Sequence, residues 1–162
     1  MSNFNAITHK AENNVAYYIK NNRAGLAYLT ASEIYNGGVV PTKRKLPCVV
    51  VHGADMKQRG GQASGLWEVS LAILVFTQVD KEKQATAHPA RVGELIALLR
   101  DIGTLKSWVN YPGEGVADNR PEKDFNLYGC LLQTQNMPEV NDHTIMTMLV
   151  YKVPCCETDQ PQ

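Results

Sequence analysis

The sequence predicts an α+β fold, a single domain in which a mainly antiparallel, mixed β-sheet is flanked by two or three helices. Apolar residues recur at helical spacing in two segments and alternate at strand spacing in several others. Short connections between consecutive strand segments favour antiparallel pairing. The length of 162 residues suits one domain, so residues 1–162 are expected to fold together.

Two segments have the spacing of amphipathic helices. The first is expected over residues 10–22, with Thr8 as its N-cap. The second is expected over residues 89–102, where five apolar side chains form one stripe. Pro89 suits the first helical position and Gly103 suits the position after the last, so both ends of this helix are predicted.

The strongest strand is expected over residues 67–79. One of its faces is apolar throughout, and the other is polar at its ends and apolar in its middle. A β-branched run at 48–51 should pair with it. The closing strands, 127–134 and 144–153, should form an antiparallel pair because only a short segment links them. The long strand is therefore expected at the centre of the sheet, packed on one face and partly covered on the other.

The other segments are expected to be irregular, apart from a short strand within residues 26–35. Residues 1–8 are expected to form a flexible N-terminal arm, and 53–65 a long, glycine-containing hairpin loop. Residues 112–126 are expected to be a long surface loop, and 154–162 a polar tail. Connections of this length without secondary structure are usually functional or disordered, so these segments are the expected contact regions.

The charge balance excludes some classes of partner. Sixteen basic residues match sixteen acidic ones, so no net charge draws the chain toward nucleic acid or a membrane surface. The longest apolar run, Leu71 to Phe76, is far too short to span a bilayer. The N-terminal residues lack the pattern of a signal peptide. The protein is therefore expected to stay in the cytoplasm where it is made, with no membrane partner.

The cysteines and histidines do not form a catalytic or metal-binding pattern. Cys48 and His52 lie on one predicted strand, where four residues separate the two side chains by about 13 Å. Cys155 and Cys156 have no second cysteine pair near them, and the four histidines are scattered, so zinc is not expected. No glycine-rich phosphate loop occurs. We expect free thiols, no catalytic residue, no metal and no cofactor, and the role of Cys155 and Cys156 stays open.

Charged residues of opposite sign concentrate in two segments. Between residues 41 and 60 there are five basic residues against Asp55 alone, and the 112–126 loop is net acidic. A basic segment of one copy could meet the acidic loop of the next in a head-to-tail contact. The candidate subunit-interface residues are Lys43, Arg44, Lys45, Lys57, Arg59, Glu114, Asp118, Glu122 and Asp124.

The order of these elements resembles the tail-completion and tail-terminator proteins of long-tailed bacteriophages. The resemblance covers roughly residues 8–153 and is a pattern of elements with one short Leu-Pro stretch. The matching parts are the helix ending near Asn22, the stretch Leu46-Pro47-Cys48-Val49-Val50-Val51, the glycine-rich hairpin, the strand from Trp67 to Val75, the helix from Arg91 to Arg100 and the closing strand ending at Val153.

The resemblance implies a structural virion protein with no catalytic residues. It implies a homo-oligomer, a hexameric ring, at the head-proximal end of the tail tube. There the ring would end tube polymerisation and form part of the head–tail joint. The implied partners are the tail tube protein and a neck or connector protein, and DNA would pass through the lumen without specific binding. The implied location is the tail or neck of the virion.

Three alternatives remain open from the sequence. Related neck and head–tail connector proteins have similar small folds. A nucleic-acid-binding module could use the basic segment 43–59, although no aromatic residue lies between Pro41 and Leu66 to stack on bases. A small cytosolic enzyme with a cysteine nucleophile would need a thiol with a lowered pKa.

Overall fold

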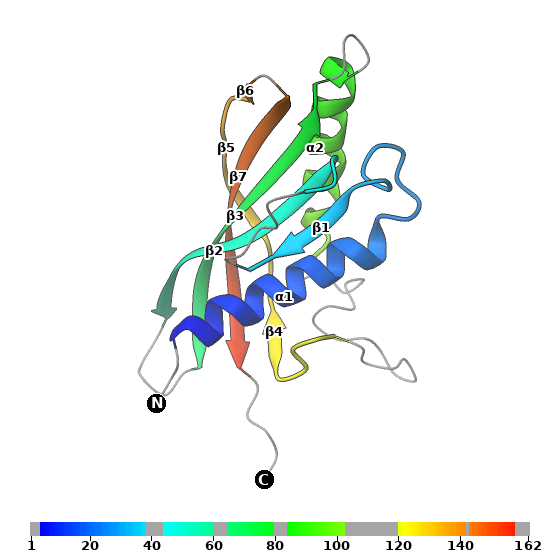
Figure 1. Ribbon diagram of the computed structural model, residues 1–162. Coiled ribbons are helices and arrows are strands. Elements are labelled where there is room, and N and C mark those ends of the chain that lie inside the picture. The colour runs from blue at the N-terminus through cyan, green and yellow to red at the C-terminus, as the bar shows by residue number, and fades with distance from the viewer. Residues whose placement is uncertain are drawn as a thin grey trace.

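The computed structural model describes residues 4–37, 44–59, 65–79, 84–102, 120–141 and 143–157. In these residues two helices, α1 (Phe4–Asn22) and α2 (Gln84–Arg100), pack against a seven-stranded, curled sheet (Figure 1). The predicted α+β single domain is confirmed.

The sheet is built around two long strands. The seven strands are β1 (Glu33–Asn36), β2 (Cys48–Arg59), β3 (Leu66–Gln78), β4 (Phe125–Leu127), β5 (Leu131–Gln135), β6 (Glu139–Val140) and β7 (Thr144–Glu157). Their order is β1-β2-β3-β7-β4, and β5 and β6 also pair with β7. Only β1 with β2 is parallel among the described pairs, so the sheet is mixed and mainly antiparallel, as predicted.

The strands β3 and β7 form the longest ladder. Their register runs without a shift from Leu66 opposite Cys156 to Gln78 opposite Thr144. β4, β5 and β6 follow one another along the other side of β7, so three short strands together cover its free edge. The predicted pairing of the 48–51 run with the long strand is also confirmed, because Cys48 lies opposite Phe76.

One face of the sheet carries the hydrophobic core. The buried residues of β3 and β7 alternate along each strand, and both helices pack on that face (Figure 1). Burying each large aliphatic side chain stabilises the fold by about 1.5–3 kcal/mol. The buried residues of these two strands are Trp67, Val69, Leu71, Ile73, Val75, Thr77, Thr147, Leu149, Tyr151, Val153 and Cys155.

A glycine lets α1 approach β2 closely. At Gly53 an added Cβ would lie 2.8 Å from Glu12 Oε1 and 2.9 Å from Thr8 Cβ, which is closer than side chains tolerate. The buried carboxylate of Glu12 accepts a hydrogen bond from the Gly53 N–H. The bulge between Gly53 and Asp55 therefore marks the point where the helix meets the sheet.

The predicted hairpin loop 53–65 is wrong over residues 53–59. These residues continue β2, and each from Asp55 to Arg59 pairs with β3. Their side chains are mostly exposed on both faces, so the sequence shows no polar–apolar alternation there. Backbone pairing with β3 forms this part of the strand, and residues 60–64 lie outside the described part of the chain.

The predicted tail begins too early, and the predicted arm ends too late. β7 continues through Pro154 to Glu157, and Cys155 is buried, because β3 and β4 flank this end of the strand. At the other end of the chain, helix α1 begins at Phe4, so Thr8 lies inside it and is no N-cap. Residues 1–3 and 158–162 lie outside the described part.

Helix α2 begins at Gln84, and so Pro89 lies inside the helix instead of at its first position. A proline at that point removes one backbone hydrogen bond. Two buried side chains next to it attach this turn to the sheet. His88 lies 2.9 Å from Thr77 Oγ1 and 2.8 Å from Thr147 Oγ1, and Arg91 donates to Thr77 Oγ1 over 2.6 Å.

A second attachment of α2 runs through Glu94. Its carboxylate accepts hydrogen bonds from the backbone N–H groups of residues 27, 28 and 29 at 3.0, 2.9 and 2.8 Å. Arg91 also donates from Nε to the Tyr28 carbonyl over 3.0 Å. The helix therefore holds the turn that leads from α1 into β1.

The burial of His88 predicts a pH-dependent stability. Desolvation, followed by the nearby Arg91 guanidinium, lowers the pKa of His88 below its ordinary value of 6.5. The unfolded chain then binds a proton before the folded chain does, so the free energy of unfolding should fall as pH drops below about 6.5. The slope should reach up to about 1.4 kcal/mol per pH unit.

Urea unfolding followed by circular dichroism between pH 5 and pH 8 measures this slope. The variant His88→Asn should be less stable at neutral pH but should lose the His88 share of the slope. Equal slopes in the two proteins would show that His88 titrates as it does in the unfolded chain.

Candidate functional site

The edge of the sheet formed by β5 and β6 exposes several large apolar side chains. All residues of both strands are exposed, and Met137, in the extended segment between them, is 86% exposed. We call these side chains the apolar edge: Tyr128, Leu131, Leu132, Met137 and Val140. Exposed edge strands can pair with other chains, and contiguous exposed apolar residues mark protein–protein contacts. The apolar edge is therefore the candidate interaction site.

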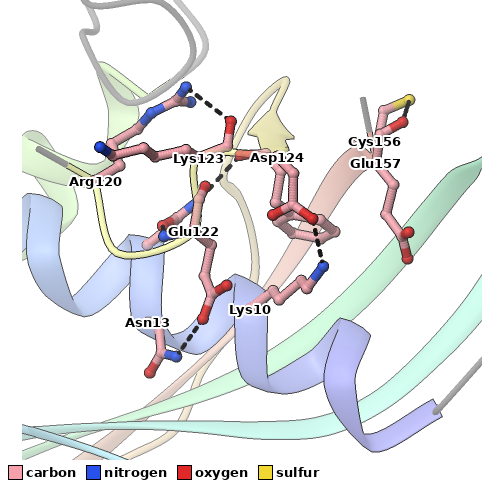
Figure 2. Close-up of polar contacts among 10 residues, drawn as sticks. Lys10, Asn13, Arg120, Glu122, Lys123, Asp124, Cys156 and Glu157 are labelled. Atoms are coloured by element: carbon pink, nitrogen blue, oxygen red, sulfur yellow. Dashed lines mark hydrogen bonds and ion pairs between the residues drawn. The ribbon is translucent and has the colours of Figure 1, made fainter. Parts of the chain in front are cut away.

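Two of the acidic candidate residues instead bind helix α1 of the same chain. Figure 2 shows Lys10 Nζ at Asp124 Oδ2, 2.9 Å apart, and Asn13 donating to Glu122 Oε1 over 2.9 Å. The hydrogen bond to Asp124, together with weaker charge effects from nearby carboxylates, raises the pKa of Lys10. Both carboxylates are thus engaged within the chain.

A buried asparagine completes this junction, which we call the α1 clasp and define as Lys10, Asn13 and Asn14 with residues 122–125. Asn14 donates from Nδ2 to the carbonyls of Glu122 and Phe125 at 3.1 and 3.0 Å. Its Oδ1 accepts the N–H of Glu122 at 3.1 Å. The clasp fixes the chain as it enters β4.

Arg120, just before the clasp in the chain, makes the next contacts. Arg120 is 6% exposed and donates to Asn126 Oδ1 over 3.0 Å and to the Lys123 carbonyl over 3.5 Å. The predicted surface loop 112–126 is therefore wrong for its last residues, because Arg120 and Phe125 are buried and β4 begins at Phe125. Residues 112–119 lie outside the described part of the chain.

The basic candidate residues lie at the two ends of β2. Arg44 stacks on Phe76, 4.3 Å from the ring centroid, and Lys45 lies 3.9 Å from Glu33. Arg59 pairs with Glu68 across the hairpin, and Lys57 lies opposite Glu68 in the register.

Arg44 and Lys45 precede the first residue of β2, whereas Lys57 and Arg59 lie among its last three. The 12 residues of β2 span roughly 36 Å. The described basic residues therefore do not form one compact patch of the kind that tracks a nucleic-acid backbone. Lys43, Glu114 and Asp118 lie outside the described residues, and the role of all nine candidates as interface residues stays a prediction.

The four cysteines are free thiols, as predicted, and three are buried. Burial raises the pKa of Cys48 to about 11 and that of Cys155 to about 12, and it also raises the pKa of Cys130. A nucleophilic cysteine needs the opposite shift, because the thiolate is the reactive form. The surroundings of these three thiols are therefore those of side chains that pack in the protein interior. The partly exposed Cys156 donates to the carbonyl of Glu157 over 3.2 Å (Figure 2).

The described residues include no group of three or more His, Cys, Asp or Glu side chains placed to hold a metal ion. Neither described helix is long and apolar enough to cross a membrane.

The comparisons with known proteins give a likeness of fold. No protein-family model matches the chain, and no curated protein sequence matches it either. One solved structure with a similar fold is a chain of the "Virion of native gene transfer agent (GTA) particle", which is 14% identical. The superposition covers 96% of this chain and 99% of that chain, with a TM-score of 0.58. The two chains therefore share one architecture over nearly their whole lengths.

Sequence reasoning missed the apolar edge. The pattern predicts one strand over 127–134, but the structure divides this segment between the end of β4 at Leu127 and β5, and it is β5 whose residues are all exposed. The available signal is Met137, an apolar residue among polar ones in a connection, where nothing in the sequence requires it.

The α1 clasp yields a prediction about stability. Replacing Asn14 with alanine leaves three backbone groups without their partners, so the variant should lose about 2–4 kcal/mol of unfolding free energy. Asn21→Ala is the matched control, because Asn21 lies on the same helix and its hydrogen bond to the Tyr17 carbonyl is exposed. Chemical denaturation of both variants checks this, and equal losses would contradict a structural role for the clasp.

Proposed function

We propose that this protein is a structural component of a phage-type virion that assembles as a ring at the head-proximal end of the tail tube. There it ends tube polymerisation and forms part of the head–tail joint. The observation that carries the proposal is the fold shared, over nearly the full length of both chains, with a chain of a gene transfer agent virion. The order of elements in the sequence supports the same assignment.

The surface chemistry supports assembly as the function. The net charge is zero, so copies of the chain do not repel one another strongly. The apolar side chains of the apolar edge are exposed to water, so their burial against another chain is favourable. The sheet behind them is a rigid frame. The partners in this proposal are other copies of the chain, the tail tube protein and a neck protein, and DNA passes through the lumen without specific contacts.

A non-enzymatic role belongs to the same proposal. The buried thiols favour the protonated form. The buried ring of His88 lies within hydrogen-bonding distance of the hydroxyls of Thr77 and Thr147. In this proposal the buried thiols and His88 are therefore structural parts of the fold.

Ring formation is the testable consequence. Purified protein, alone and with its cognate tail tube protein, should form particles of about 107 kDa, six times the chain mass of 17.9 kDa. Mass photometry gives the mass, and negative-stain microscopy shows whether rings sit on one end of tubes of limited length. Rings that bind a head connector but not the tube would favour the neck position. A protein that stays monomeric beside the tube protein would contradict the proposal.

A further inference from the structure

A cavity of about 260 Å³ lies between the C-terminal half of α2 and the edge strand β5. It opens beside the apolar edge, since two residues of that edge line it. The lining residues are Ile96, Arg100, Cys130, Leu131, Leu132 and Tyr151. Three of these residues have aliphatic side chains. The other three, Arg100, Cys130 and Tyr151, supply a guanidinium, a thiol and a phenol.

The phenol in this cavity has no hydrogen-bond partner among the described residues. Tyr151 is 1% exposed, and buried polar groups are normally paired. Desolvation raises its pKa, and the next largest effects come from Cys130 and Arg100, so the hydroxyl lies near these two lining residues. The cavity therefore offers apolar walls, one unused buried donor and one exposed cation to whatever enters it.

The complementary feature lies on the same chain, in residues 137–139, where the extended edge runs from β5 into β6. Met137 is 86% exposed, and Glu139, two residues further on, is also exposed. A methionine side chain is flexible and fills irregular apolar spaces. A carboxylate beside it matches the charge of Arg100. Residues 137–139 thus carry an apolar side chain and an anion at the spacing of two residues.

Residues 137–139 do not reach the cavity of their own chain. Met137 lies six residues beyond Leu131 along an extended edge, at a distance of roughly 20 Å. Residues 137–139 therefore cannot fill the cavity of their own chain, and the same residues of a second copy offer matching chemistry.

We propose that residues Met137–Glu139 of one copy insert into the cavity of the next copy. Met137 packs against the aliphatic walls, Glu139 pairs with Arg100, and the Tyr151 hydroxyl donates to a backbone carbonyl of the entering segment. The inference rests on the proposed function, for which it supplies the contact between neighbours. Because this segment and the cavity are different surfaces, the contact is head-to-tail and closes into a ring when the rotation allows.

Charge reversal tests the inference. Glu139→Arg and Arg100→Glu should each raise the concentration at which rings form by at least about tenfold, as expected when like charges meet at an interface. The double variant restores opposite charges at every contact and should return to within about threefold of the original. Lys20→Glu, an exposed reversal on α1, is the matched control. Thermal melting shows that each variant is folded.

A crosslink tests the same contact by position. In a Cys156→Ser background, Met137→Cys should form a disulfide with Cys130 of the neighbouring copy under mild oxidation. Mass spectrometry identifies the linked peptides, and adding Cys130→Ala should abolish the link.

The outcomes separate the two proposals. Rings that tolerate both single reversals, or that give no crosslink to Cys130, overturn this inference and leave the ring function standing. Protein that forms no ring, alone or with the tube protein, overturns the proposed function and the inference with it. Loss of rings in each single variant with recovery in the double variant supports both.

Discussion

The pairing of β3 with β7 is the interaction on which the rest of the structure depends. Its register continues without a bulge from one end of β3 to the other, so alternate residues of both strands point to the same face. That face is apolar, and both helices cover it. A slip of one residue would turn the apolar set toward solvent, which is why the register is strongly specified. β2 then adds to one side of the pair, and β4, β5 and β6 add to the other.

Polar side chains decide how the helices sit on this frame. Glu12 meets the backbone of β2 at Gly53, Asn14 holds the chain entering β4, and His88 reaches the threonines of the central strands. Glu94 binds three successive N–H groups of the turn before β1. Apolar packing alone permits a helix to slide or rotate. Buried polar groups that need partners make one placement better than its neighbours.

The surface that remains concentrates its apolar chemistry at one edge. The clasp uses Glu122 and Asp124 within the chain, and the basic residues lie at opposite ends of β2. The apolar edge and the cavity behind it have no comparable use inside the described structure. In the assembly that we propose, these features are the ones that contact further copies of the chain.

The sequence by itself determined the fold class, the long central strand and the apolar faces, because periodicity records which side of an element is buried. It could not determine where β2 and β7 end, since residues such as Asp55 and Lys57 are strand only through pairing with β3. Nor could it separate charges used within the chain from those left for partners. Asp124 meets Lys10 across more than a hundred residues. Only tertiary structure decides such contacts. It also decides that β5 is an exposed edge, because the position of a strand in the sheet depends on which other strands pair with it.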